Sequence, residues 1–193
     1  MAEATIIANI SKHIRLDEAE TAFFISLLKP RKLKKKELLL RAGDICRYET
    51  FVVKGCLRSY SIDEAGVEHI IMFAMEDWWT SDLYSLLTQE PSRFSIEALE
   101  ETEVLQISKD DLELLFNKVP KFDRLYRILF QNAFIAHENR ITQNLSLTGE
   151  QRYLQFQQKY PTLEQRIPQK QIAAFLGMTP EFLSMIRRKL SGK

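Results

Sequence analysis

The polar side chains near the end of the chain recur at a spacing that would gather them on one side of a helix. At 100° per residue, one face of the segment after Thr179 would carry Glu181, Ser184, Met185 and Arg188. An arginine pairs bidentately with guanine, a glutamate accepts a hydrogen bond from cytosine, and a serine contacts either kind of base edge. A face of this kind has the chemistry needed to enter the major groove of double-stranded DNA.

The same segment carries signals for a helix start and for a tight turn before it. Thr179 is a natural N-cap, and Pro180 suits the first helical position. Gly177 permits the left-handed backbone that a tight turn requires, and the small side chain of Ala173 lets two helices approach closely. Residues 167–190 are therefore predicted to form a helix-turn-helix unit. In its second helix, the side chains expected to face inward are Phe182, Leu183, Ile186 and Leu190.

Positive charge is concentrated around this unit. Residues 147–193 hold eight basic and three acidic residues, a net charge of +5, whereas the whole chain carries +1 and the remainder therefore −4. This asymmetry favours a polyanion as the partner of the C-terminal part. A helical hairpin that only packs is the alternative. The residues predicted to contact DNA are Gln169, Lys170, Thr179, Pro180, Glu181, Ser184, Met185, Arg187, Arg188 and Lys189, with Arg166 and Lys193 as further phosphate contacts.

A single long helix is predicted over residues 121–146, which contain neither Gly nor Pro. One apolar stripe would suffice to dock this helix on its own domain, so a second stripe predicts contact with a second copy of the chain. A single wide buried face is the alternative. One stripe comprises Phe122, Leu125, Leu129, Ala133 and Ala136, and the other comprises Tyr126, Phe130, Phe134, Ile141 and Leu145. We assign the dimer contact to Leu125, Leu129, Ala133 and Ala136.

The region before the long helix is rich in short β-type runs. Residues 5–28 have helical periodicity, with Asp17 as a plausible cap. Strands are predicted at 37–41, 48–54, 57–62, 67–74 and within 94–108, with short helices at 82–89 and 109–119. Short strands about 8–12 residues apart are typical of a barrel or sandwich. After the long helix, Gly149 marks a break and Thr148 can cap a further helix over 149–160.

Several other chemistries lack the residues they need. Cys46 and Cys56 are too few for a disulfide framework, a four-Cys zinc site or a four-Cys iron–sulfur cluster, and we interpret them as small apolar side chains. The single histidines His13, His69 and His137 suggest no haem or metal ligand set. No P-loop, Gly-x-Ser-x-Gly or His-Glu-x-x-His motif is present, so we do not expect an enzyme. Without a membrane-length apolar run or a signal-peptide pattern, we expect a cytoplasmic protein that makes no membrane contact.

The order of these elements resembles the Crp/Fnr superfamily of bacterial transcription regulators over nearly the whole chain. The stretch LLLRAGDICRYETFVVKGCLRSYSIDEAGVEHIIMF is similar to the first half of a cyclic-nucleotide-binding fold, and the helix-turn-helix match is the more specific one. The resemblance implies an α+β fold in three parts. These are an N-terminal double-stranded, jelly-roll-like β-roll sensor domain at 1–119, a dimerisation helix at 120–146 and an all-α helix-turn-helix domain at 147–193.

The second half of the roll departs from relatives that bind cyclic AMP. Those relatives have a Gly-Glu pair before the short helix and an Arg followed by small residues after it, whereas this chain reads Ser-Asp-Leu at 81–83 and Ser-Arg-Phe-Ser at 92–95. The arginine is shifted by one position, which in a strand turns a side chain to the opposite face. We assign no cofactor, because these departures argue against a cyclic nucleotide. The degenerate effector pocket is expected at Ser81, Asp82, Leu83, Ser92, Arg93 and Ser95.

These features predict a homodimeric, sequence-specific DNA-binding regulator of transcription. The expected partners are double-stranded DNA, a second copy of the chain, an unidentified small-molecule effector and, by family resemblance, RNA polymerase. A signal in the roll would act by shifting a hinge near Ser146–Gly149. Two alternatives stay open. One is a small-molecule or cyclic-nucleotide sensor whose helical tail does not read DNA, and the other is a constitutive DNA-binding protein that uses the roll only as a dimer scaffold.

Overall fold

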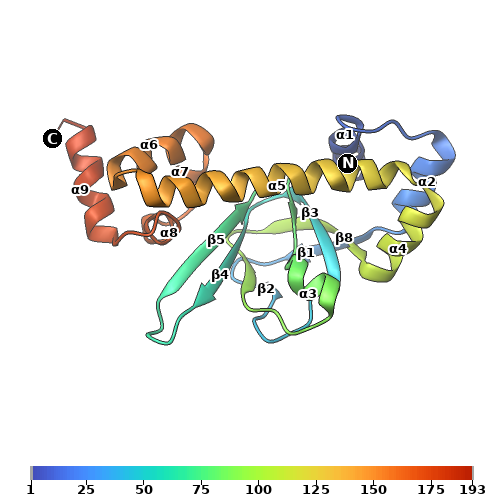
Figure 1. Cartoon of the computed structure of the whole chain (residues 1–193), viewed down its shortest axis with the longest axis horizontal. Helices are drawn as coiled ribbons and strands as arrows, with labels where there is room; N and C mark the ends of the chain where they lie inside the picture. Colours follow the sequence, from blue (N-terminus) through green and yellow to red (C-terminus); the bar gives the residue numbers. More distant parts are fainter. Residues whose placement is uncertain (1, 193) are drawn as a thin grey trace. The chain divides into compact units, whose positions relative to one another are not determined.

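The computed structural model describes residues 2–192 and divides into two compact units (Figure 1). The roll unit contains the residues up to Ser61 together with Met72–Gln131, and the head unit contains Ile62–Ile71 together with the residues from Asn132 onward. The predicted phosphate contact Lys193 lies outside the described residues. Among the helices between residues 2 and 192, none combines the length and the apolar character that a membrane span requires.

Two four-stranded sheets form the β-roll, with strand orders β1-β8-β3-β6 and β2-β7-β4-β5. The pairs β1–β8, β3–β8, β3–β6, β2–β7 and β4–β7 are all antiparallel. The first sheet comprises β1 (Lys29–Leu33), β8 (Thr102–Ser108), β3 (Tyr48–Lys54) and β6 (Trp79–Thr80). The second comprises β2 (Leu38–Leu40), β7 (Ser95–Ala98), β4 (Leu57–Ile62) and β5 (Glu68–Ala74).

Alternation along the strands gives the first sheet two apolar faces. Val52 on β3 points between the two sheets, where it packs with Leu57 and Ile96 of the second sheet. Its neighbour Phe51 points to the opposite side and packs against Trp79, with 5.2 Å between the ring centroids. Helices cover this second face: α1 (Ala2–Ser11), α2 (Glu18–Ser26), α4 (Lys109–Lys118) and the start of α5 (Lys121–Ser146).

The helical segment predicted over residues 5–28 forms two helices, and the predicted cap at Asp17 is confirmed at the start of the second. The capping box at Asp17 is the reason that a new helix begins there. The Asp17 carboxylate accepts a hydrogen bond from the Glu20 amide at 2.8 Å, and the Glu20 carboxylate accepts one from the Asp17 amide at 2.9 Å. Strands β1 and β6 were not predicted from the sequence. The first is mostly exposed and lacks an apolar alternation, and the second has only two residues.

The long helix α5 has the predicted bounds, but its dimer assignment needs correction. Leu125 has no accessible surface, because it packs with Phe122 in the core of its own roll unit. It therefore cannot contact a second copy, and its assignment to the dimer face is wrong. Leu129 also packs against this core, whereas Ala133 and Ala136 are exposed. In the other stripe, Tyr126 is buried, whereas Phe130, Phe134, Ile141 and Leu145 are exposed.

The head unit is built from residues 62–71, the later part of α5 and four short helices. The predicted cap at Thr148 is confirmed: Thr148 and Gln151 form a capping box at the start of α6. Pro161 ends α6 as expected, but the single turn α7 that follows it was not predicted. The four helices are α6 (Gly149–Lys159), α7 (Leu163–Arg166), α8 (Gln169–Phe175) and α9 (Pro180–Leu190).

Arg140 joins three segments of the head unit. Its guanidinium donates to the carbonyl oxygens of Ile70 at 2.7 Å and Phe175 at 3.1 Å, and also to that of Ile71. It stacks on the Phe175 ring at 4.3 Å from the centroid. Burial lowers the pKa of Arg140, and the carbonyl dipoles offset the loss of hydration. Arg140 thereby connects residues 62–71, the long helix and the end of α8.

Comparison of Gly55 with Gly43 can separate the cost of steric overlap from the cost of the backbone conformation. Both have positive φ, +99° and +93°, but a Cβ at Gly55 would lie 2.5 Å from Thr102 Oγ1, whereas one at Gly43 would meet nothing within 4 Å. We expect Gly43→Ala to cost about 1 kcal/mol for the backbone conformation alone. Gly55→Ala should cost at least about 3 kcal/mol, because steric overlap is added. Urea denaturation of both variants tests this, and equal losses would contradict it.

Candidate functional site

Helix α9 exposes the polar face that the sequence predicted. The Thr179 hydroxyl accepts a hydrogen bond from the Phe182 amide at 3.2 Å, so the predicted N-cap is present, with Pro180 in the first turn. The positions expected to face outward are exposed, namely Glu181, Ser184, Met185 and Arg188. The helix therefore offers solvent a row of donors and acceptors that begins at its N-terminal turn.

The packing beneath α9 agrees with the prediction at four positions and differs at two. Gly177 has φ +63°, and Ala173 is fully buried where α8 meets α9. Leu183 and Ile186 are buried as expected, but Phe182 and Leu190 are 41% and 40% exposed. The Phe182 ring lies against Gly149, where an added Cβ would come within 2.6 Å of it. Gly149 is thus needed for close approach as well as for the end of the long helix.

Two of the predicted DNA contacts are ion-paired within the head unit. Arg187 Nε lies 3.5 Å from Glu164 Oε1, and Lys189 Nζ lies 2.5 Å from Glu150 Oε2. The Glu164 carboxylate also accepts a hydrogen bond from the Tyr153 hydroxyl at 2.5 Å. Burial and this bond raise the pKa of Tyr153 to about 12. These cations are therefore partly neutralised and help to hold α6, α7 and α9 together.

Two other predicted contacts keep their charge without a carboxylate partner among residues 2–192. Arg188 and Lys170 are exposed and form no ion pair there. Gln169 Nε2 donates to Ser184 Oγ at 3.0 Å, which brings the start of α8 to the polar face of α9. The structure thus gathers Gln169, Ser184 and Arg188 on an open surface of the head unit.

The predicted effector pocket does not form, because its polar groups bond to one another. Asp82 is only 3% exposed and caps α3 (Leu83–Thr88) by accepting a hydrogen bond from the Ser85 amide at 3.2 Å. The Ser92 hydroxyl donates to the same carboxylate at 2.6 Å. Ser95 Oγ accepts a hydrogen bond from the Ala42 amide at 2.9 Å. A carboxylate that is buried and engaged in this way is not placed to receive a ribose hydroxyl.

The other predicted pocket residues point elsewhere. Arg93 is exposed and stacks on the Tyr84 ring at 4.7 Å from the centroid, so no phosphate cradle forms around it. Leu83 is 38% exposed on α3. Phe94, the bulky residue after the arginine, packs against the core between the two sheets. Of the six residues predicted for the pocket, Ser81 alone lines the cavity described next.

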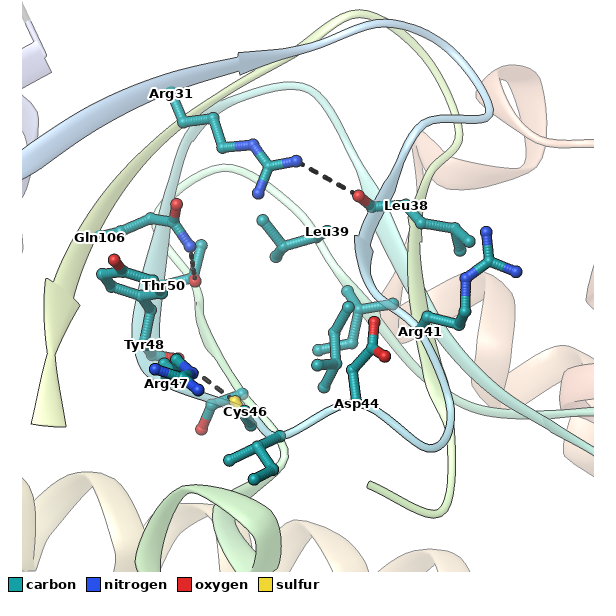
Figure 2. A pocket seen from close by; sticks show the side chains of 14 residues that line it. Arg31, Leu38, Leu39, Arg41, Asp44, Cys46, Arg47, Tyr48, Thr50 and Gln106 are labelled. Atoms are coloured by element: carbon teal, nitrogen blue, oxygen red, sulfur yellow. Dashed lines mark hydrogen bonds between the residues drawn. The ribbon is translucent and has the colours of Figure 1, made fainter. Parts of the chain in front are cut away.

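A cavity of about 350 Å³ beside Ser81 is lined by residues that the sequence analysis did not single out (Figure 2). Thr50 and Gln106 occupy inward positions on β3 and β8, two residues from the core valines of the same strands. Polar side chains at such positions were the signal that could have revealed it. Three arginines also line the cavity, namely Arg31, Arg41 and Arg47.

Glu49 is a buried carboxyl on the helix-covered side of the first sheet. Burial raises its pKa to about 7, while the hydrogen bond that the Ser81 hydroxyl donates to it at 2.7 Å opposes the rise. Ser81 therefore touches both the cavity and the one strongly perturbed carboxyl among the described residues of the roll unit. No sequence pattern marked Glu49, because a polar residue in a strand is ordinarily exposed.

Comparison with known proteins agrees with this architecture. Residues 30–119 match the family model described as "Cyclic nucleotide-binding domain". An anaerobic regulatory protein of Haemophilus influenzae is 26% identical over 144 residues, which cover 73% of this chain and 54% of that protein. The resemblance to the Crp/Fnr superfamily is confirmed. The chain thus spans about half the length of this curated relative.

Solved structures show the same fold. FixK2 from Bradyrhizobium japonicum has a TM-score of 0.76 at 19% identity, with coverage of 86% of this chain and 85% of that one. The c-di-GMP responsive global regulator CLP of Xanthomonas campestris has a TM-score of 0.73 at 14% identity, with coverage of 91% and 92%. The α+β architecture of β-roll, long helix and C-terminal helices is therefore confirmed.

The raised pKa of Glu49 should make the protein less stable as the pH rises. Between the usual value of 4.5 and about 7, the folded state keeps the proton that the unfolded state has lost. The free energy of unfolding should therefore fall through this window by up to about 3 kcal/mol. Glu49→Gln should abolish this decrease because an amide does not titrate, and urea denaturation between about pH 5 and 8 measures it. The exposed control Glu101→Gln should retain the wild-type slope, and a flat wild-type profile would contradict the assignment.

Proposed function

We propose that this chain is a homodimeric DNA-binding regulator of transcription that recognises a specific sequence through α9. The observation that carries the proposal is the exposed, capped face of α9, on which Arg188 remains free of any carboxylate among residues 2–192. Its neighbours Arg187 and Lys189 are ion-paired, whereas the Arg188 guanidinium, in the last turn of α9, is available to DNA. The names of the curated relatives, which describe regulators rather than enzymes, support this role.

Charge on the head unit supports the same partner. Two of its acidic residues, Glu150 and Glu164, are paired with lysine and arginine. The remaining exposed cations include Lys170 and Arg188, and these can neutralise backbone phosphates or pair with guanine. By the family resemblance, we also propose a cytoplasmic location and contact with RNA polymerase at a promoter.

The exposed apolar stripe of α5 supports a homodimer. Phe130, Phe134, Ile141 and Leu145 are between 43% and 84% exposed and fall within about 60° of one another around the helix. A stripe of this size on one helix needs an apolar cover, and the same stripe of a second copy offers a self-complementary one. Two α9 helices would then be about 34 Å apart on a palindromic site. An effector would act by shifting the segment Ser146–Gly149 between two arrangements.

The DNA proposal predicts different losses for two neighbouring arginines. Arg188→Gln should weaken binding to the preferred site by about tenfold or more, because a bidentate base contact contributes about 1–3 kcal/mol. Arg187→Gln should have a smaller effect, because Glu164 already engages that side chain. The site is first selected from a random duplex pool, and affinities are then measured by fluorescence anisotropy at fixed salt. Failure to enrich any sequence, with or without cyclic AMP, would favour a sensor whose tail does not read DNA.

The dimer proposal predicts a matched contrast on α5. Phe134→Glu combined with Ile141→Glu should convert the dimer to a monomer, because four carboxylates would face one another across an apolar contact. Asn132→Glu combined with Asn139→Glu adds the same charges at the same spacing on the opposite, exposed side and should leave the dimer intact. Sedimentation velocity distinguishes these outcomes, and a monomeric wild-type chain would refute the proposal.

A further inference from the structure

A buried hydrogen bond of the head unit spans the segment proposed as a hinge. Arg140 lies on α5 and Phe175 at the end of α8, and the segment Ser146–Gly149 lies between them in the chain. The Arg140 guanidinium donates to the Phe175 carbonyl oxygen at 3.1 Å. A shift of α8 and α9 about Ser146–Gly149 therefore has to break this hydrogen bond.

The bond reaches the helix-turn-helix at its turn. Phe175 is the last residue of α8, where helix carbonyls need donors from outside the helix and where a cation is favoured. The turn begins directly after it, with Gly177 at φ +63°. The Met178 amide donates to the Ala173 carbonyl oxygen at 3.0 Å, so the turn is itself anchored to α8. Arg140 therefore holds the point from which the direction of α9 is set.

The same guanidinium also holds β5. It donates to the carbonyl oxygen of Ile70 at 2.7 Å and to that of Ile71. β5 is an edge strand of the second sheet, so carbonyl groups on its outer edge need a partner other than a neighbouring strand. Beyond Ile71, β5 continues as far as Ala74 in the roll unit. Arg140 thus connects the turn of the helix-turn-helix with a strand that runs on into the roll unit.

These contacts require a guanidinium group. Its planar fork offers several donors and a face that stacks on an aromatic ring, whereas a lysine has the same charge on one nitrogen and no planar face. Arg140 stacks on the Phe175 ring, and that ring packs against Phe156 of α6 with 5.8 Å between the centroids. A second hydrogen bond across the hinge, from Arg152 Nη1 to Asn144 Oδ1, is exposed and 3.4 Å long. The buried contacts of Arg140 are therefore the stronger constraint on the hinge.

We propose that Arg140 is a positioning residue for DNA recognition. It holds the helix-turn-helix in one orientation on α5, so that the two α9 helices of a dimer keep the separation that a palindromic site requires. A head held in this way has little orientational freedom to lose when both half-sites are bound, and this raises affinity. A head released from Arg140 would read a half-site equally well but would sample many separations. This inference rests on the proposed function.

Arg140→Lys tests this role, because it keeps the charge and so preserves the electrostatic attraction to DNA. Fluorescence anisotropy of the full chain is measured on single half-site duplexes and on palindromes of varied half-site spacing, with the sequence selected from the random pool. A spacing change of about two base pairs should weaken wild-type binding about tenfold and binding of the variant less than about threefold. At the preferred spacing, the variant should bind about tenfold more weakly than wild type, with single half-site affinity unchanged.

Arg127→Lys is the matched control, since this exposed arginine of α5 donates to Gln131 and should behave as wild type. Equal spacing preference in wild type and Arg140→Lys would overturn the proposal. Loss of single half-site binding by Arg140→Lys would also overturn it, because the residue would then be needed to fold the head rather than to position it.

Hydrogen exchange tests the contact in the absence of DNA. In Arg140→Lys, amide exchange should become faster both in residues 68–71 and in residues 173–178, because one guanidinium joins these segments. Faster exchange in only one segment would refute the connection. A wild-type chain that enriches no duplex sequence would overturn the proposed function and the role of Arg140 in spacing, whereas the exchange rates would decide the connection independently.

Discussion

The rest of the roll unit depends on the hydrogen-bonded pairing of β8 with β1 on one side and with β3 on the other. Its residues pair with Lys29–Leu33 of β1 on one side and with Tyr48–Lys54 of β3 on the other. Lys29 pairs with Gln106 and Lys54 with Glu103, so this last strand pairs with residues between 49 and 77 positions away in the chain. Such long closures are favourable only when several form together. The pairing sets Val104 between the sheets, places Leu105 and Ile107 beneath the helices, and puts Gln106 against Thr50 in the cavity wall.

Whether a polar group has a partner separates structural roles from binding roles in both units. Asp82 and Ser92 are buried and bonded to each other, so they stabilise the start of α3. Arg187 and Lys189 are likewise held by carboxylates of the head unit. Arg188 has no carboxylate partner among the described residues, and the DNA proposal rests on it. Residue type alone would not have distinguished the polar groups with a structural role from those available for binding.

Much of the secondary structure was predictable from local signals. The capping residues Asp17, Thr148 and Thr179 act within three positions of themselves, and the break at Gly177 depends on its own backbone conformation. The bounds of α5 followed from the absence of Gly and Pro. Strand β1 was not predicted, because its partner β8 lies some 70 residues away and β1 itself has no alternation of apolar and polar residues.

The sequence by itself determined the order of the elements, the helix-turn-helix and the departure from the cyclic-nucleotide pattern, because each depends on neighbouring residues. Only the tertiary structure decided that Leu125 belongs to a core, that Asp82 bonds to Ser92, and that Glu49 is buried with a pKa near 7. It alone brought Arg31, Arg47 and Gln106 to one cavity. The physical reason is that burial, desolvation and charge pairing depend on neighbours in space, which strands distant in sequence supply.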